Sequence, residues 1–179
     1  MQNLFTPWRY GYLSGGRREK GCIFCQARDS KDDRSHLVVH RGRFNFIILN
    51  RYPYNSGHLM VVPYDHLAVL SRATPVQLRE MMLLAARAEK ALQDAYSMDG
   101  LNLGMNLGTA AGAGVLGHFH LHLVPRWNGD TNFMTVTGKT RVTPEILQET
   151  YRKLQPLLKA RRKNRGPRRN PLPRRNRRG

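Results

Sequence analysis

The sequence has few cysteines, few acidic side chains and no long apolar run, and each shortage excludes a class of protein. Cys22 and Cys25 are too close together to cross-link much of a fold, so in a reducing compartment they indicate metal ligands or a redox pair. The longest apolar run, Met81–Ala86, is far too short to span a bilayer. The first residues lack a basic stretch followed by an apolar one, which argues against a secretory signal. These features predict a cytoplasmic protein with no membrane partner.

The scarcity of acid leaves a strong positive charge, which is unevenly distributed. Only 12 acidic residues oppose 30 lysines and arginines, for a net charge of +18. Eleven of the basic residues lie in segment 159–179, so residues 1–158 keep +7. That segment has almost no apolar side chains and three prolines, which predicts one folded domain over 1–158 followed by a disordered Arg-rich tail. The tail could bind RNA or another polyanion without reading its sequence, or could act only as a solubility appendage, and both readings stay open.

Two helices can be placed from their start signals and periodicity. Thr74 is a good N-cap, Pro75 suits the first helical position, and Gln77 completes a capping box, so we expect a helix from there to about Ser97. A second helix is expected after Thr143-Pro144, with one apolar stripe at Leu147, Tyr151, Leu154 and Leu158.

Strand candidates outnumber the helices. They are Ser35–Arg41, Phe44–Asn50, the segment GHLMVVP at 57–63, the segment LNLGMNLG at 101–108, and a histidine-bearing segment at 117–125. Because helices do not alternate one for one with strands, the order predicts an α+β fold with a mostly antiparallel sheet.

The histidine-bearing segment, GHFHLHLVP, holds three of the seven histidines in the chain. In a strand, successive side chains point to opposite faces, so His118, His120 and His122 would share one face. The alternating apolar residues Phe119, Leu121 and Leu123 would supply a core. A row of imidazoles can bind a metal or can hold and attack an anion.

A loop of small residues, 108–114, comes just before the histidines. Its backbone N–H groups can approach an anion closely, as a phosphate cradle does. A neutral imidazole is a competent nucleophile toward phosphorus, and its phosphoramidate product is reactive enough for a second acceptor to resolve it. Together, the loop and the histidines favour phosphate chemistry, which neither would indicate alone.

Residues 118–124, HFHLHLV, resemble the signature His-φ-His-φ-His-φ-φ (φ, apolar) of the histidine triad (HIT) superfamily of nucleotidyl hydrolases and transferases. Upstream, ILNRYPYNSGHLMVVPYDH is similar to the other marked segment of that family, and CIFC near the start is also common among its bacterial members. RYPYNSGHLMVVPY together with the segment GTAAGAGVLGHFHLHLVPRWNGDTNFM resembles the diadenosine tetraphosphate phosphorylase branch. The resemblance covers roughly residues 4–155 and implies a HIT-like fold, an approximately five-stranded antiparallel sheet with two main helices. It also implies a homodimer, whose sheet is continuous between subunits, or a higher homo-oligomer.

The resemblance implies a catalytic pair and a set of nucleotide contacts. His120 matches the nucleophile that forms a nucleotidyl-histidine intermediate, and His122 matches the residue that holds the α-phosphate. Asn50 falls where members place an Asp or Asn on the ribose hydroxyls. The matching phosphate-holding residues are Asn106, Gly112, Ala113 and Gly114, with His122. Many members carry a Gln and a Ser or Thr just before the triad, where this chain has Gly114 and Val115. Backbone N–H groups would therefore have to replace the help that those side chains give to the leaving group.

The resemblance also implies a structural Zn²⁺ ion. Zinc-binding members use a cysteine pair in the N-terminal loop, a histidine after the GH-φφφ-P strand and the first triad histidine, which here are Cys22, Cys25, His66 and His118. A thioredoxin-like redox reading lacks a surrounding βαβ pattern. His58 fits either a wall of the phosphate site or a packing position, whereas His36 and His40 have no partner pattern and are read as non-catalytic.

The implied function is nucleotidyl transfer at the α-phosphorus of a nucleoside polyphosphate. Diadenosine tetraphosphate phosphorylase, which yields ATP and ADP from substrate and inorganic phosphate, fits best. A nucleoside phosphoramidate or dinucleoside polyphosphate hydrolase using the same His120 is one alternative. The other is a nucleic-acid-associated nucleotide-binding protein that uses the basic tail.

Overall fold

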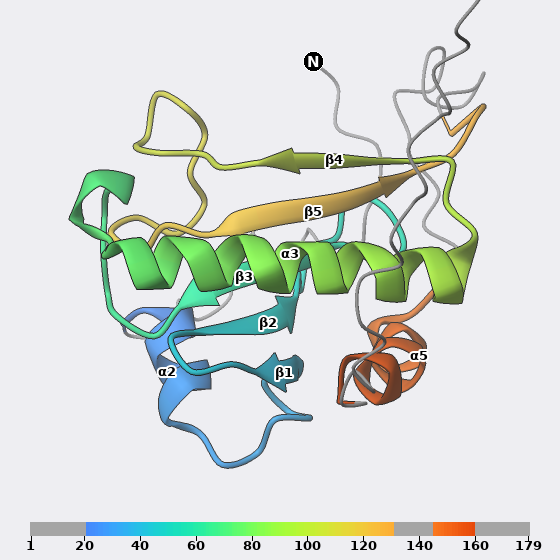
Figure 1. The fold of residues 1–179 in the computed structure, drawn as a ribbon, viewed down its shortest axis with the longest axis horizontal. Helices are drawn as coiled ribbons and strands as arrows, with labels where there is room; N and C mark the ends of the chain where they lie inside the picture. Colours follow the sequence, from blue (N-terminus) through green and yellow to red (C-terminus); the bar gives the residue numbers. More distant parts are fainter. Residues whose placement is uncertain (1–20, 131–144, 160–179) are drawn as a thin grey trace, which may run out of the picture.

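The computed structural model describes residues 21–130 and 145–159 as a five-stranded sheet with three α-helices (Figure 1). The elements follow in the order α2 (Ile23–Asp29), β1 (Val38–Arg41), β2 (Asn45–Leu49), β3 (Leu59–Pro63), η1 (Leu70–Arg72, a 3₁₀ turn), α3 (Pro75–Tyr96), β4 (Gly100–Gly104), β5 (Leu121–Arg126) and α5 (Leu147–Lys159). None of the helices in this part of the chain is long and apolar enough to cross a membrane.

The sheet has the strand order β1-β2-β3-β5-β4, and every neighbouring pair is antiparallel. The predicted α+β class with a five-stranded antiparallel sheet is therefore confirmed. β5 pairs with β3 and β4 at once, so His122 lies opposite Met60 on one side and Gly104 on the other. This position holds His122 between two strands, whereas His118 and His120 precede β5.

The long helix α3 begins where its sequence signals predict. The Thr74 side chain accepts from the backbone N–H of Gln77, and the Gln77 side chain accepts from the N–H of Thr74 at 2.8 Å, which completes the capping box. The helix ends at Tyr96, and Ser97 follows in the left-handed conformation. α3 lies across one face of the sheet with α5 beside it (Figure 1).

Two apolar clusters lie on opposite faces of the sheet. The larger one joins the sheet to α3 and α5 and includes Phe119, Leu121 and Leu123, as the alternation of the histidine segment predicts. The smaller one packs α2 on the other face and includes Phe24, Phe46, Ile48, Met60 and Val62. The histidines of the segment point toward the α2 face.

The β1–β2 turn is tied to α3 by one carboxylate. Glu80 accepts backbone N–H groups from Arg43 at 2.7 Å, Phe44 at 2.7 Å and Asn45 at 2.8 Å. Burial opposes ionisation, but these hydrogen bonds outweigh it and lower the pKa of Glu80. A side chain at Gly42 would place its Cβ 2.7 Å from the carbonyl oxygen of Asn45, so this turn requires glycine.

Several predicted boundaries were wrong, for local physical reasons. Residues 23–29 form helix α2 and not a loop. Cys22 is the N-cap of this helix, and Cys25 lies three residues later, so both cysteines are on the same side of it. β1 begins at Val38 instead of Ser35, since the Asp32 carboxylate holds a turn by accepting from the N–H groups of Arg34 and Ser35. β5 begins at Leu121, because the N–H of Phe119 donates to Leu67 and not to a strand.

Parts of the prediction lie outside the described residues. The start of the second helix at Thr143-Pro144 is among them, although its stripe at Tyr151, Leu154 and Leu158 is buried as expected. Lys159, the first residue of the expected tail, ends α5, and segment 160–179 is not described.

Candidate functional site

The three histidines of the segment lie together on the face of the sheet that α2 covers. The ring of Phe24, a fully buried residue of α2, lies 5.3 Å from the ring of His118 and 4.8 Å from that of His120, centroid to centroid. The rings of His120 and His122 are 4.7 Å apart. The structure therefore places the three side chains in one row, and their backbone surroundings give each one a different chemistry.

The backbone fixes the proton of His120 on Nδ1. This nitrogen lies 3.0 Å from the carbonyl oxygen of His118, which can only accept a hydrogen bond. The lone pair of the neutral ring is therefore on Nε2. Burial lowers the pKa of His120, although its bond to the carbonyl opposes the shift, so the ring is neutral at pH 7. A neutral imidazole with a free Nε2 lone pair is what nucleophilic attack on phosphorus requires.

His122 has the opposite arrangement, because His58 donates to it. The backbone N–H of Tyr54 donates to Nδ1 of His58 at 3.1 Å, so the proton of His58 is on Nε2. That proton is donated to Nδ1 of His122 at 2.9 Å. His122 consequently carries its own proton on Nε2 and can donate it to a phosphate oxygen.

Burial keeps both members of this pair neutral. It lowers the pKa of His58 to about 3, assisted by the charges that His122 and His120 would carry. Burial, followed by the repulsion of a charged His120, lowers the pKa of His122 to about 4. The hydrogen-bonded relay from Tyr54 through His58 to His122 is thus uncharged at pH 7. His58, for which the sequence left two interpretations, belongs to the site. It lies two residues before Met60 of β3, so the alternation of a strand would have placed it on the same face of the sheet as Met60.

The expected ribose residue Asn50 lies beside the relay. Its side-chain nitrogen is 3.4 Å from both ring nitrogens of His58, and its side-chain oxygen accepts from the N–H of Tyr52 at 2.9 Å. Asn50 is therefore held one contact away from His122, and its proposed role on the ribose stays a prediction.

The small-residue loop before the histidines is wound into its own turns. The N–H of Gly112 donates to Thr109 at 2.9 Å, and that of Ala113 donates to Gly108 at 3.2 Å. Gly108 and Gly112 both have positive φ, which glycine adopts without strain. The phosphate-holding roles of Asn106, Gly112, Ala113 and Gly114 stay predictions. In this conformation two of those N–H groups are already bonded within the loop.

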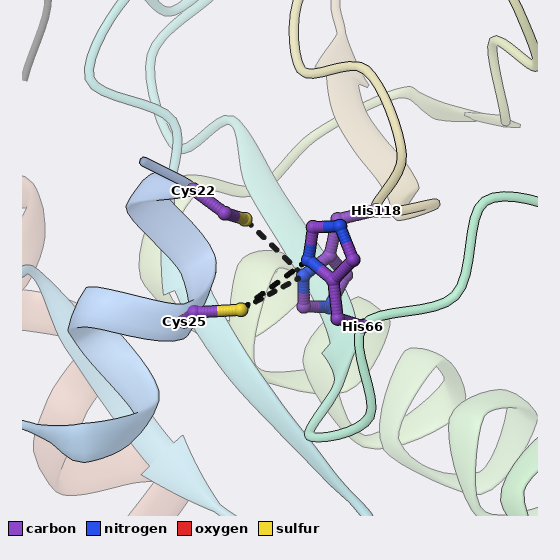
Figure 2. A group of neighbouring side chains, drawn as sticks. All are labelled: Cys22, Cys25, His66 and His118. Atoms are coloured by element: carbon purple, nitrogen blue, oxygen red, sulfur yellow. Dashed lines mark hydrogen bonds between the residues drawn. The ribbon is translucent and has the colours of Figure 1, made fainter. Parts of the chain in front are cut away.

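A second group of side chains lies next to the row and shares His118 with it (Figure 2). The Sγ atom of Cys22 is 3.3 Å from Nδ1 of His118, and that of Cys25 is 3.3 Å from Nδ1 of His66 and 3.8 Å from Nδ1 of His118. All four candidate ligand atoms lie within 4.8 Å of one another. The structure thus brings together the four residues that the sequence assigned to one metal site.

The donor set fits a tetrahedral metal. Zinc bonds of about 2.3 Å to sulfur and 2.0 Å to nitrogen place the ligand atoms of a tetrahedral site roughly 3.3–3.8 Å apart. The three sulfur–nitrogen distances of 3.3, 3.3 and 3.8 Å fall in that range. Nε2 of His118 donates to the carbonyl oxygen of Pro63 at 2.9 Å, which leaves Nδ1 as the ligand atom. Burial lowers the pKa of His118 to about 4, so it is neutral, as a ligand must be. Gly117, with positive φ, permits the close approach of His66, whose Nε2 would be 3.1 Å from an added Cβ.

Comparison with known proteins agrees with this geometry. Residues 31–129 match the HIT domain family. An AP-4-A phosphorylase of Mycobacterium tuberculosis is 38% identical over 161 residues, which cover 86% of this chain and 83% of that protein. The adenylylsulfatase HINT3 of Arabidopsis thaliana is 27% identical over 120 residues, 67% of this chain and 59% of that protein.

Solved structures show the same fold. A Zn-bound histidine triad family protein from Mycobacterium smegmatis superposes with a TM-score of 0.62 at 29% identity, covering 77% of this chain and 93% of that one. A hypothetical histidine triad nucleotide-binding protein from Sulfolobus tokodaii gives a TM-score of 0.58 at 30% identity, covering 76% of this chain and 89% of that one. The chain therefore belongs to the histidine triad (HIT) family and is an enzyme of the nucleotidyltransferase or hydrolase type.

Proposed function

We propose that the chain cleaves diadenosine tetraphosphate at an α-phosphorus and transfers the adenylyl group to inorganic phosphate, giving ADP and ATP. The observation that carries the proposal is the hydrogen bond from His120 to the His118 carbonyl, which leaves Nε2 of His120 as a neutral nucleophile beside the proton on Nε2 of His122. The similarity to an AP-4-A phosphorylase supports the choice of substrate.

In the first step, Nε2 of His120 attacks the α-phosphorus, and the bond from that phosphorus to the bridging oxygen of ATP breaks. The ATP leaves with the electron pair of that bond, and the adenylyl group remains on Nε2. His122 donates its Nε2 proton as a hydrogen bond to a non-bridging oxygen, where negative charge builds up. The relay through His58 keeps this donor pointing toward the reacting phosphate.

In the second step, an oxygen of inorganic phosphate attacks the same phosphorus. The bond to Nε2 breaks, the electron pair returns to His120, and ADP is released. Water in place of phosphate would give AMP. The similarity to the adenylylsulfatase HINT3 makes this hydrolytic outcome the second candidate.

We expect purified protein to convert diadenosine tetraphosphate to ATP and ADP only when phosphate is present. With ¹⁸O-labelled phosphate, the label must appear in the β-phosphate of ADP, because the new bond joins the acceptor to the α-phosphorus. Product chromatography with mass spectrometry measures both. His120→Ala should lower turnover by roughly 10³-fold or more, because no other group takes the adenylyl unit.

The matched control is His36→Ala, which removes a histidine outside the site and should retain turnover. ATP and AMP formed regardless of phosphate would make the chain a hydrolase with the same nucleophile. Unchanged turnover in His120→Ala would contradict the assignment of the nucleophile.

The same family geometry supports a structural zinc ion. We infer that Cys22, Cys25, His66 and His118 bind one Zn²⁺ through two thiolates and two Nδ1 atoms. When bound, the ion would supply a cross-link between α2, the segment after β3 and the histidine segment. The ligands form a closed set, which is typical of structural zinc and leaves His120 to do the chemistry.

Elemental analysis should find one zinc ion per chain. Cys22→Ser should reduce that content and lower the thermal midpoint by roughly 5 °C or more, since metal binding energy contributes to folding. A Co²⁺-loaded sample should show thiolate-to-cobalt charge-transfer absorption, which Cys22→Ser weakens and His36→Ala does not. A full zinc content in both Cys22→Ser and Cys25→Ser would rule out this ligand set.

His58 makes the stability of the fold depend on pH. The unfolded chain binds a proton on this residue near pH 6.5, whereas the folded chain does so only near pH 3, so stability falls as pH falls between these values. We expect His58 to account for a loss of about 2 kcal/mol in the free energy of unfolding between pH 7 and 5.

Urea unfolding at both pH values measures this dependence. His58→Leu should show a smaller fall than the parent chain, and His36→Leu should keep the original fall. An equal fall in His58→Leu and the parent chain would mean that other groups set the acid sensitivity.

The exposed edge of the sheet supports a homodimer. β4 is the last strand in the sheet order, and Leu103 on it is 51% exposed. On α3, Met82 and Leu83 are 56% and 60% exposed. We infer that a second copy of the chain covers these surfaces, because an open strand edge with exposed apolar neighbours is a template for pairing.

Light scattering during gel filtration should therefore give at least twice the 20.6 kDa chain mass. Leu83→Glu combined with Leu103→Lys should reduce the mass to that of one chain. Leu157→Glu, which changes an exposed leucine on α5, serves as the matched control and should leave the mass unchanged. A single-chain mass for the parent protein would refute the dimer.

A further inference from the structure

The ring of Tyr54 lies on the solvent side of the hydrogen bond between His58 and His122. Its centroid is 4.7 Å from that of the His58 ring and 6.0 Å from that of the His122 ring, and its plane is tilted by only 27° from the plane of His122. Tyr54 is 43% exposed, whereas His58 is 1% exposed and His120, the next ring in the row, is 4% exposed. Among the described residues, Tyr54 is therefore the exposed member of this group of rings.

Tyr54 makes two separate contacts with His58. Its backbone N–H donates to Nδ1 at 3.1 Å and fixes the tautomer, and its side-chain ring packs against the imidazole. The backbone contact is available to any residue except proline, but the ring contacts with His58 and His122 require an aromatic side chain. Substitution at position 54 can therefore remove the ring and still leave His58 its backbone donor.

The loop that carries Tyr54 is fixed by contacts with distant parts of the chain. The side-chain nitrogen of Asn55 donates to the carbonyl oxygen of Pro125 and to the carboxylate of Asp130, both at 3.0 Å. Asn55 is buried, so water competes little for these hydrogen bonds. Gly57 follows with a φ of 78°, and an added Cβ there would lie 3.0 Å from two side chains of α3. These contacts hold the exposed ring in its place over the histidines.

Water is the remaining partner that could stabilise a charge on His122. Burial is the main cause that lowers the pKa of His58 to about 3 and the pKa of His122 to about 4. Among the described residues, the titratable groups that pack against His122 are His58, His120 and Tyr54. The residues opposite it on β3 and β4 carry no charge. The cover over the histidine pair therefore determines how easily His122 is protonated.

Protonation of His122 would break the relay. The charged ring carries a proton on each nitrogen, so its Nδ1 could no longer accept from Nε2 of His58. The Nε2 donor of His122 would then lose the orientation that this hydrogen bond gives it.

We propose that Tyr54 is a positioning residue of the transfer site, whose ring covers the His58–His122 hydrogen bond against water and so holds His122 in the orientation that donates from Nε2. The ring acts through the histidine pair and not on the reacting phosphorus. Its effect on turnover rests on the proposed function, whereas its effect on the two histidines does not.

NMR of the full chain in zinc-containing buffer, with ¹⁵N in the histidine rings, measures the protonation of His58 and His122. In the parent chain His122 should be about one-tenth protonated at pH 5, because its pKa is about 4. Tyr54→Ala should raise this fraction to roughly half or more, since water then reaches the pair. The tautomer of His58 should stay the same, because its backbone donor remains. Tyr54→Phe should behave as the parent chain does, since the ring and not the hydroxyl provides the cover.

Leu157→Ala is the matched control. It removes an apolar side chain of similar exposure, 39%, from α5, and should leave both titrations unchanged. Tyr54→Leu keeps part of the apolar cover and should give a smaller rise in the same direction, which covers the case in which Tyr54→Ala fails to fold. Unchanged protonation of His122 in whichever of these two Tyr54 variants folds would overturn the proposal.

Steady-state kinetics separate this role from a direct contact with substrate. Loss of a donor that acts in the transition state lowers kcat with little change in KM, so between pH 8 and pH 5 Tyr54→Ala should lose roughly twofold more kcat than the parent chain, or more. Tyr54→Phe should restore the parent profile. A raised KM with unchanged histidine titrations would mean that the ring binds substrate, against the positioning role.

The NMR measurement uses no substrate, so it separates this inference from the proposed function. A shifted His122 titration in Tyr54→Ala, together with a parent chain that does not turn over diadenosine tetraphosphate, would support the cover and contradict the proposed function alone.

Discussion

The chemistry of the site depends on two backbone carbonyl groups that can accept hydrogen bonds but cannot donate them. The carbonyl of Pro63 holds the proton of His118 on Nε2, and the carbonyl of His118 holds that of His120 on Nδ1. His118 and His120 therefore leave different ring nitrogens without a proton: Nδ1 of His118, which faces the cysteines, and Nε2 of His120, which is the proposed nucleophile. Side-chain partners could change protonation with pH, but a carbonyl cannot, so these tautomers persist as long as the two hydrogen bonds to the carbonyls are kept.

His118 connects the two halves of the site. Its Nδ1 faces the cysteines, while its carbonyl orients the ring of His120, the proposed nucleophile, two residues later. Phe24 adds a second connection, since it lies between Cys22 and Cys25 in the chain and packs on both His118 and His120. A metal that fixes α2 against the histidine segment would thus also limit the movement of His120. The proposed structural ion would contribute to catalysis through rigidity, without contacting substrate.

Sequence reasoning succeeded where one local rule decides the outcome. The capping box at Thr74 predicted the start of α3, and the period of two predicted which face of the histidine segment enters the core. It failed where contacts between residues far apart in the sequence decide the structure. Helix α2 has only seven residues and no capping side chain, so its stability comes from packing Phe24 on the sheet. The role of His58 depends on a residue 64 positions away.

The strong positive charge of the chain raises the question of how its transfer site stays uncharged. Three arginines near the sheet are each paired with an acid: Arg28 with Asp29, Arg41 with Asp33 and Arg126 with Asp130. The histidines have no such acid among the partners that set their pKa values, so burial decides their state and keeps them neutral. A carboxylate beside His120 would raise its pKa and occupy the lone pair with a proton. The basic surface can therefore attract anions over a distance, while burial keeps His120, the proposed nucleophile, unprotonated.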